Sequence, residues 1–502
     1  MKKKEMRSGQ SYKNEYEKYL NEIKETGFVE RIIPPLVYVN GLPGARLDEV
    51  VYFESGEMGI VRSLEEEETE VLVFSNKPVR VGSQVARSGN ILMIPVGDDF
   101  LGQSVDPLGN SLNPARASPA GSELRSVDEQ APGIGVRERV VEPFITGVTV
   151  VDLMIPLGKG QRELVLGDRK TGKTEFLLQT MLSQAREGAV CIYAGVGRKK
   201  ADIKKIEDFI AESGIQQSTI VISSSSTDPL GLIYITPYCA MTLSEYFKDT
   251  GRNVVLILDD MSTHAKFYRE ISLVGRRFPG RNSYPGDIFY THARLLERAG
   301  NFQTQYGVCS LTCLPVVETI ESDISGYIQT NLMSITDGHV YFDTELFEQG
   351  RRPSVNYFLS VTRVGRQTQS KLHWGVNREL SSFLTLLEKT KRYIHFGAEI
   401  NEGIRSTLAM GDRIMTLFNQ PMGKIFPINL QMFLFSLIWA GLLGDISPTE
   451  LTKVMDNSLK SYMLEDDFRQ LVDKLIEENE DFNVLLGKIS SQSKSFMDKI
   501  KE

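Results

Sequence analysis

The sequence predicts a multidomain protein with a small N-terminal β-barrel, a central α/β P-loop domain with a mainly parallel sheet, and a C-terminal α-helical bundle. Short β runs punctuated by glycines, between residues 27 and 95, predict the barrel. A glycine loop between an apolar run and a helical segment, at Gly167 to Thr174, predicts the central domain. Amphipathic helical segments after about Gln369 predict the bundle.

Length and composition support several domains. The chain has 502 residues, of which 41% are hydrophobic, and this length exceeds what a single hydrophobic core usually includes. Changes in the pattern of apolar, polar and turn-forming residues along the sequence predict four regions. They are an N-terminal arm over 1–26, the barrel over 27–95, the nucleotide-binding domain over 96–375 and the helical domain over 376–502.

The charge balance and apolar runs exclude several classes of protein. Lys and Arg number 57 against 65 acidic residues, and a net charge of −8 argues against nucleic acid as the main partner. No apolar run approaches the ~18 residues of a membrane span, and the longest, Met432 to Leu443, fits a buried helix. No apolar segment follows the basic start, so we expect a cytoplasmic chain. The scattered cysteines, including Cys309 and Cys313, are expected to be small core residues.

The N-terminal part divides into an arm and a set of strands. Ser8 to Lys24 is polar, with tyrosines at helical spacing, and predicts a peripheral helix or a mobile arm. The acidic run Glu65 to Glu68 is interpreted as a solvated hairpin end. The clearest β runs that follow the arm are Val50–Phe53, Val71–Phe74 and Ile91–Ile94.

The glycine loop has the composition and context of a phosphate-binding P-loop. It follows the apolar run Leu164–Leu166 and precedes a helical segment, so backbone N–H groups and the positive helix end converge on an anion. Lys173 is expected to reach the outer phosphates, and Thr174 to ligate magnesium. The candidate nucleotide-binding residues of the loop are Gly167, Asp168, Arg169, Lys170, Thr171, Gly172, Lys173 and Thr174.

Strands and helices alternate after the P-loop, which predicts a parallel sheet covered on both faces. Asp259 ends one of these strands, where a Walker B aspartate belongs, and is expected to hold magnesium through water beside Thr174. The expected strands are Ala189–Tyr193, Thr219–Ile222 and Val254–Leu258, and the expected helices are Lys200–Glu212 and Leu230–Asp249. The C-terminal helices are expected at Leu380–His395, Ile404–Phe418, Leu430–Leu443, Glu450–Leu464 and Asp467–Glu478.

Several stretches carry a family resemblance, from about Gly27 to Leu443. The chain resembles the alpha subunits of F-type rotary ATP synthases, and the resemblance implies a RecA-like central domain. The stretch from Tyr284 to Asp287 and the run beginning at Arg294 favour alpha over beta. The matching stretches are Glu142–Gly147, Gly160–Leu164, the P-loop beginning at Gly167, Tyr284–Asp287, Arg294–Ala299, Ser334–Gly338 and Ser360–Gly365.

The resemblance implies a set of partners. Alpha and beta subunits would alternate in a ring of three each around a gamma-type central shaft, with ATP or ADP and Mg²⁺ at the interfaces. A delta-type peripheral-stalk subunit is the implied partner of the N-terminal arm. The ring would lie on the inner face of the cell membrane, attached only through a membrane sector, and would couple ATP synthesis or hydrolysis to proton transport.

The residue after the first strand beyond the P-loop predicts that the chain's own site is non-catalytic. Catalysis needs a carboxylate there to orient the attacking water, and the beta family has Gly-Val-Gly-Glu. This chain has Gly195-Val196-Gly197-Arg198, and a guanidinium cannot accept a proton from water. Alpha subunits usually carry Gln at the Arg198 position, and also at the Lys170 position. The added positive charges either tighten phosphate binding or face solvent, and solvent is favoured because basic residues at a helix start are ordinarily hydrated.

Three further residues receive roles from the resemblance. Arg363 would be an arginine finger that reaches into the beta subunit's catalytic site and neutralises charge on the transferred phosphoryl group. Read without the resemblance, an Arg before Val-Gly is more often a salt-bridged loop residue. Ser360 would help to place the finger loop, and Gln420 would contribute to adenine recognition.

Two alternatives remain open. A self-sufficient P-loop ATPase motor, such as a helicase or secretion ATPase, should keep a catalytic glutamate, and Arg198 argues against it. A paralogous alpha-like subunit, in a ring that does mechanical or structural work without ATP synthesis, is compatible with the departures at Lys170 and Arg198.

Overall fold

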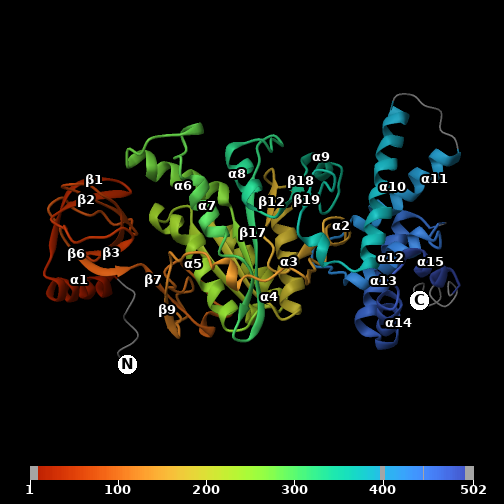
Figure 1. Ribbon diagram of the computed structural model, residues 1–502, viewed down its shortest axis with the longest axis horizontal. Helices are drawn as coiled ribbons and strands as arrows, with labels where there is room; N and C mark the ends of the chain where they lie inside the picture. Colours follow the sequence, from red (N-terminus) through yellow and green to blue (C-terminus); the bar gives the residue numbers. More distant parts are fainter. Residues whose placement is uncertain (1–8, 396–401, 445, 492–502) are drawn as a thin grey trace. The chain divides into compact units, whose positions relative to one another are not determined.

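The computed structural model describes residues 9–395, 402–444 and 446–491 (Figure 1). It has the expected N-terminal barrel, α/β nucleotide-binding region with a mostly parallel sheet, and C-terminal helices. The chain folds into two compact units. The first unit contains Met1–Glu138, Ala185–Glu318 and Asp323–Thr336, and the second contains Arg139–Gln184, Thr319–Ser322 and Asp337–Glu502. No helix among the described residues is both long and apolar enough to cross a membrane.

The barrel of the first unit closes because its short strands place an apolar side chain inward at every second position. Its core includes Val39, Val51, Phe53 and Val71, all of them fully buried. The acidic run expected at a hairpin end joins two neighbouring strands of the barrel, as predicted. The strands are β1 (Thr26–Ile33), β2 (Leu36–Asn40), β3 (Glu49–Phe53), β4 (Met58–Leu64), β5 (Thr69–Val73) and β6 (Gln84–Ile91), in the antiparallel order β1-β2-β5-β4-β3-β6.

The N-terminal segment is a helix, α1 (Gly9–Ile23), packed on β3 and β6 (Figure 1). The Tyr16 hydroxyl donates to Gln84 over 2.7 Å, and the Tyr19 ring stacks on Tyr52 with the ring centroids 5.6 Å apart. Of the two expectations for this segment, the structure therefore supports the helix.

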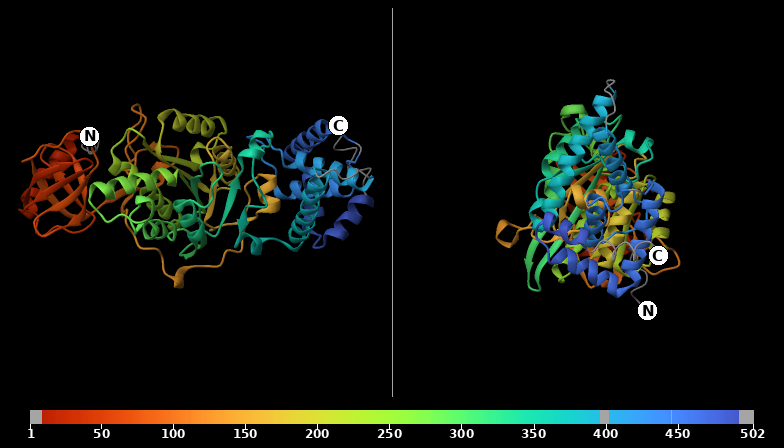
Figure 2. Two further views of the ribbon diagram at one scale, coloured as in Figure 1. Left: turned by 90° about the horizontal axis from the view of Figure 1, so that it is seen from above. Right: turned by 90° about the vertical axis from the view of Figure 1, so that its right-hand side faces the viewer.

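The α/β part of the first unit is a parallel sheet with helices against it (Figure 2). Its strands are nearly continuous apolar runs, because parallel strands covered by helices have both faces buried. In spatial order they are β17 (Gly307–Glu318), β15 (Val254–Asp259), β13 (Val190–Arg198), β14 (Thr219–Ser225) and β8 (Ser104–Val105), and β16 (Gly300–Thr304) pairs antiparallel with β17. Beside them, β7 (Met93–Val96) pairs antiparallel with β9 (Glu123–Ser126).

The two helices expected in this part, Lys200–Glu212 and Leu230–Asp249, begin and end where the sequence predicts. Cys309 and Cys313 are buried in β17, as expected for core residues. The α-helices are α4 (Lys200–Glu212), α5 (Leu230–Asp249), α6 (Met261–Val274), α7 (Ile288–Leu296) and α8 (Tyr327–Ile335). The short 3-10 helices are η1 (Asp98–Phe100), η2 (Ile134–Val136), η3 (Gln216–Ser218) and η4 (Arg281–Ser283).

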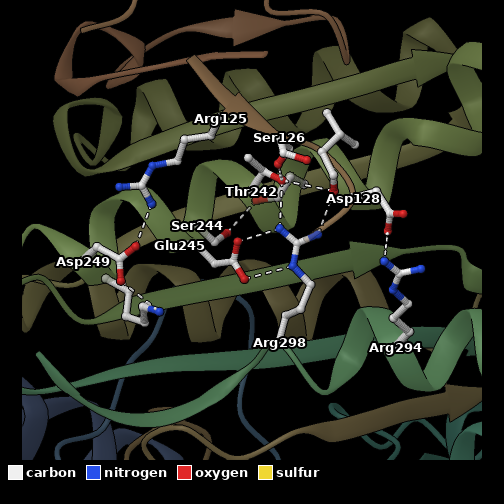
Figure 3. Close-up of polar contacts among 12 residues, drawn as sticks. Arg125, Ser126, Asp128, Thr242, Ser244, Glu245, Asp249, Arg294 and Arg298 are labelled. Atoms are coloured by element: carbon white, nitrogen blue, oxygen red, sulfur yellow. Dashed lines mark hydrogen bonds and ion pairs between the residues drawn. The ribbon is translucent and has the colours of Figure 1, made fainter. Parts of the chain in front are cut away.

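A buried arginine ties α5 to the end of α7 and to the segment after β9. Arg298 is 1% exposed and points at Glu245, to which Nε donates over 2.9 Å and Nη2 over 2.5 Å (Figure 3). Its Nη1 donates to the carbonyl of Val127 over 2.8 Å, and Nη2 also donates to Thr242 over 2.9 Å. The run from Arg294 to Ala299, which favours an alpha-type chain, thus contains a buried arginine that connects three segments of the first unit.

The second unit contains the P-loop and the C-terminal helices. Its strand β12 (Glu163–Gly167) pairs parallel with β18 (Gly338–Phe342), which pairs antiparallel with β19 (Val361–Thr362). The short strand β10 (Pro143–Phe144) pairs antiparallel with β11 (Leu157–Gly158). The accompanying helices are α2 (Thr149–Met154), α3 (Lys173–Arg186), α9 (Thr344–Glu348) and the 3-10 helix η5 (Gly365–Thr368).

The C-terminal helices form a bundle with α12 at its centre, because α12 packs against most of the others. Its apolar residues, from Leu430 to Ile438, are buried, as expected for a long apolar run, but the helix ends at Trp439 rather than at the expected Leu443. The helices are α10 (Lys371–His395), α11 (Glu402–Phe418), α12 (Ile428–Trp439), α13 (Pro448–Leu464), α14 (Asp466–Glu477) and α15 (Phe482–Ser491), shown in light to dark blue in Figure 1.

Candidate functional site

The P-loop lies between β12 and α3, as the sequence predicts. At Gly167 a Cβ atom would clash with the carbonyl oxygen of Phe342, so the strand end has no room for a side chain. Gly172 adopts φ +90°, a conformation that favours glycine. Lys170 also has a positive φ, 62°, and its side chain is exposed, like that of Arg169. The helix then begins at Lys173, so its first N–H groups belong to the loop.

The side chain of Lys173 folds over its own loop. It is 8% exposed, and Nζ donates to the carbonyls of Gly167 over 2.7 Å and Asp168 over 2.5 Å. Thr171 donates to the Asp168 carbonyl over 2.8 Å and receives on its own carbonyl the hydroxyl of Ser354, over 2.7 Å. The loop is therefore held in shape by its own polar groups, with a cation at its centre.

Asp168 anchors the P-loop to neighbouring parts of the second unit. Its carboxylate accepts from Thr319 Oγ1, from Ser322 N over 2.9 Å and from Thr344 Oγ1 over 3.1 Å. Partial burial raises the pKa of Asp168, but these hydrogen bonds outweigh it and lower the pKa below its ordinary value. The carboxylate is thus ionised and positions the loop.

Arg198 lies beside Asp259 in the first unit. Strands β13 and β15 are parallel neighbours, with Gly195 opposite Asp259. Gly197 has φ +61°, and the pairing with β14 shifts register between Gly195 and Arg198. Arg198 Nη2 then lies 3.1 Å from Asp259 Oδ2, with the arginine side chain 22% exposed and the aspartate side chain 4% exposed.

The expectation that the added charges face solvent is therefore wrong for Arg198. A carboxylate at the end of the neighbouring strand compensates the guanidinium, so the side chain can be largely buried. Burial by itself lowers the pKa of Arg198, but the attraction of Asp259 outweighs it, and the pKa is raised. Lys170 is exposed, as expected, and Lys199 and Lys200, which follow Arg198, are exposed too.

Sequence reasoning missed a second partner of Asp259. The Tyr193 hydroxyl, fully buried on β13, donates to Asp259 Oδ2. Burial and the nearby carboxylate raise the pKa of Tyr193 well above its ordinary value. A tyrosine inside an otherwise apolar buried strand was the available signal, because a buried hydroxyl needs a partner.

The second aspartate of the Asp259-Asp260 pair has a separate task. Asp260 has φ +82° and caps α6: its carboxylate accepts from Thr263 N over 2.9 Å and from Thr263 Oγ1 over 2.5 Å. This is the usual role of an aspartate before a helix. The cap leaves Asp259 as the candidate magnesium ligand of the pair.

One oxygen of this carboxylate is already used by protein groups. Asp259 Oδ2 has a guanidinium and a phenol as partners, and a magnesium ion or its waters would compete with them for that oxygen. Within the described parts of the chain, no group of three or more His, Cys, Asp or Glu side chains is arranged to hold a metal. Thr174 is half-buried at the start of α3.

Arg363 lies on the loop after β19 with an exposed side chain. Its backbone N–H donates to the Asp337 carbonyl over 3.1 Å, and its side chain forms no ion pair with any residue in the described ranges. Ser360 fixes the same loop: its hydroxyl donates to the Asn356 carbonyl over 2.7 Å and accepts from Tyr341 N over 2.9 Å. The backbone of the loop is thus anchored. The positive charge of the exposed Arg363 acts to lower the pKa of the buried Glu163 carboxyl, although burial keeps that pKa well above its ordinary value.

Gln420 is buried, with 3% exposure. Its carbonyl oxygen accepts from Thr149 N over 3.0 Å and Thr149 Oγ1 over 3.1 Å, and its amide nitrogen donates to the carbonyls of Gly147, over 2.7 Å, and Lys424. Both ends of the amide are used within the protein. This geometry favours a role in fastening the 419–424 loop to the start of α2 rather than in adenine recognition.

The P-loop, its parallel strands and the motifs that follow it agree with a comparison against known families. Residues 147–362 match the model of the ATP synthase alpha/beta family, nucleotide-binding domain. The match supports a nucleotide-binding chain of the rotary ATPase kind. The model describes alpha and beta subunits together, so the distinction between them depends on individual residues such as Arg198 and Arg363.

Proposed function

We propose that this chain is the non-catalytic, alpha-type nucleotide-binding subunit of a rotary ATPase ring. The observation that carries the proposal is Arg198, which stands at the end of β13 where catalysis needs a carboxylate and is bound to Asp259. A guanidinium cannot take a proton from the attacking water. The chain's own site would therefore bind ATP or ADP through the P-loop without turning it over.

In this proposal the chain contributes to chemistry at the partner's site. Arg363 would reach from its anchored loop into the catalytic site of a beta-type neighbour, where the guanidinium would stabilise charge on the transferred phosphoryl group. The exposure of Arg363 and the absence of an ion pair to its side chain among the described residues support this role. The hydrogen bonds of Ser360 would maintain the loop at the reach that the finger needs.

The proposed assembly is a ring of three alpha-type and three beta-type subunits around a gamma-type shaft. A delta-type subunit would contact the N-terminal segment, and the ring would couple ATP synthesis or hydrolysis to proton transport. It would meet the inner face of the cell membrane only through a membrane sector.

A second candidate is a paralogous ring that does mechanical or structural work without ATP synthesis. The Arg198–Asp259 ion pair favours it, because alpha subunits of synthases usually carry Gln in place of Arg198. Neighbouring genes for a proton-channel ring and both stalks would favour the synthase, and their absence would favour the paralogue.

The first test uses the isolated chain. Titration calorimetry should detect ATP or ADP binding, while a phosphate-release assay should detect no turnover. Hydrolysis at an ordinary enzyme rate would contradict a non-catalytic site.

The second test uses the assembled ring with Arg363→Ala and Arg363→Lys. Both should leave ring assembly intact and lower turnover per ring by about 10³-fold or more. Lysine should not rescue turnover, because it lacks the planar fork that addresses two oxygens. Arg366 is an exposed arginine in the adjacent 3-10 helix η5, and Arg366→Ala is the matched control that should keep normal turnover. Poor assembly with normal turnover per intact Arg363→Ala ring would instead indicate a structural role.

A further inference from the structure

A buried carboxyl that the proposed mechanism does not use lies in the same row of strands as the loop that carries Arg363. Glu163 is the first residue of β12 and is 0% exposed. It is paired in register with Gly338 on β18, and Gly338 is paired with Thr362 on β19, the residue before Arg363. Three neighbouring strands of the second unit thus connect the carboxyl to this loop.

Gly338 provides the space in which the carboxyl lies. A Cβ atom at position 338 would meet both carboxyl oxygens of Glu163, at 2.7 and 2.8 Å, and also the Val361 carbonyl oxygen of β19. A glycine in the middle strand therefore lets the side chain of one outer strand approach the other. Gln161 spans the same distance, because its Nε2 donates to Glu163 Oε2 over 2.6 Å and to Thr362 Oγ1 over 3.5 Å.

The surroundings of the Glu163 carboxyl favour its neutral form. Its hydrogen-bond partner is the uncharged amide of Gln161, and its Oε1 atom has no hydrogen-bond partner in the described ranges. The adjacent cation, Arg162, pairs with Asp337 over 2.8 Å. A carboxyl that is buried without a paired cation takes up a proton, because the charged form is too costly to desolvate. Accordingly, burial and, to a smaller extent, the charge of Asp337 raise the pKa of Glu163 well above its ordinary value.

The charge state of Glu163 affects Arg363. The positive charge of Arg363 opposes the rise in the Glu163 pKa, so an ionised carboxylate would attract the guanidinium in return. While the carboxyl is neutral, this attraction is absent. Burial lowers the pKa of His339, which Arg363 also influences, so this neighbour adds no competing charge at neutral pH.

We propose that Glu163 is a positioning residue for Arg363: its neutral carboxyl fills the space beside β19 and leaves the guanidinium available to an anion on a neighbouring subunit. The ionised carboxylate would instead draw Arg363 toward its own sheet, in competition with the transferred phosphoryl group. This role rests on the proposed arginine finger and adds the group that keeps the charge of the finger uncompensated.

Infrared spectroscopy of the isolated full chain tests the charge state. At neutral pH the unmodified chain should show the C=O stretch of a protonated carboxylic acid that Glu163→Gln lacks. As the pH rises, this band should disappear at a higher pH in Arg363→Ala than in the unmodified chain, because loss of the positive charge favours the neutral form. Arg366→Ala, which removes an exposed arginine from the adjacent helix η5, should not change the midpoint. No such band at neutral pH, or equal midpoints in the two arginine variants, overturns the proposal.

Assembled rings test the positioning role. Glu163→Ala empties the space beside β19 and should lower turnover per intact ring by about tenfold, because a small displacement of a catalytic group is costly. Glu163→Gln has the shape of the neutral carboxyl and should restore most of this loss. The unmodified ring should also lose turnover relative to the Glu163→Gln ring as the pH rises through the infrared midpoint.

The outcomes separate this role from the function on which it rests. If Glu163→Gln rings are as impaired as Glu163→Ala rings, the ionised carboxylate is the working form and the proposal is overturned. Normal turnover of intact Glu163→Ala rings overturns it as well, and leaves the finger standing. Normal turnover of intact Arg363→Ala rings removes the finger itself, and the role of Glu163 with it.

Discussion

Removal of Arg298 is expected to destabilise the first unit more than removal of any surface arginine near it. The change is Arg298→Met, which keeps an unbranched side chain and removes the charge. Arg298 is 1% exposed, and the Glu245 side chain is 10% exposed (Figure 3). Methionine would leave the Glu245 carboxylate buried without its cation, and the Val127 carbonyl would keep only the longer hydrogen bond from Thr242 Oγ1, over 3.4 Å.

The expected cost follows from these contacts. Breaking a buried ion pair by deleting one partner typically costs about 3–5 kcal/mol, because a buried charge is left uncompensated. The double variant Arg298→Met, Glu245→Met removes both charges and should recover most of the loss, since well-packed apolar replacements of buried pairs are often close to neutral. The single variant should therefore be less stable than the double variant.

Hydrogen exchange of the α5 amides measures the loss of stability locally. A local measurement suits a multidomain chain, because its unfolding is not a single transition. Arg294→Met is the matched control: this arginine pairs with Asp128 over 3.0 Å, with about a third of each side chain exposed, and should cost about 0–1 kcal/mol. If the opening free energy of α5 falls equally little in Arg298→Met and Arg294→Met, the reasoning about the buried charge is refuted.

Three further predictions concern the P-loop, the finger loop and a buried histidine. Lys173→Ala should weaken the subunit's own nucleotide binding by about 1.5–3 kcal/mol in calorimetry, yet leave substantial turnover in the ring. Complete loss of turnover in intact rings would contradict the proposal that the chain's own site is non-catalytic. Gly365→Ala should lower turnover per ring, because its Cβ would clash with the Pro156 carbonyl oxygen and displace Arg363; unchanged turnover would show that the loop tolerates the shift. Burial lowers the pKa of His264 to about 4, so the folded state holds it neutral. The unfolded state takes up the proton first as pH falls from about 6.5, and on the order of 3 kcal/mol of stability should be lost by about pH 4. Hydrogen exchange of the α6 amides, followed against pH, should lack this part of the pH dependence in His264→Phe, and identical profiles would exclude His264 as its source.

The sequence by itself determined the order of the fold and the position of the P-loop. Alternating apolar strands, the loop from Gly167 to Thr174 and the amphipathic C-terminal segments are local patterns, and their periodicity and glycine content require no knowledge of distant contacts. The buried helix α12 was predictable for the same reason, because a long apolar run has to be covered. These local signals were sufficient because each describes a single element.

The surroundings of individual polar side chains were decided only by the tertiary structure. Arg198 was expected to be hydrated, but Asp259 lies far along the chain from it, and only the parallel pairing of β13 with β15 brings the two together. Gln420 is likewise distant in sequence from Thr149, and the packing within the second unit uses both ends of its amide. Burial of a charge or an amide depends on partners that are distant in sequence, because desolvation is tolerable only where a complementary group is present.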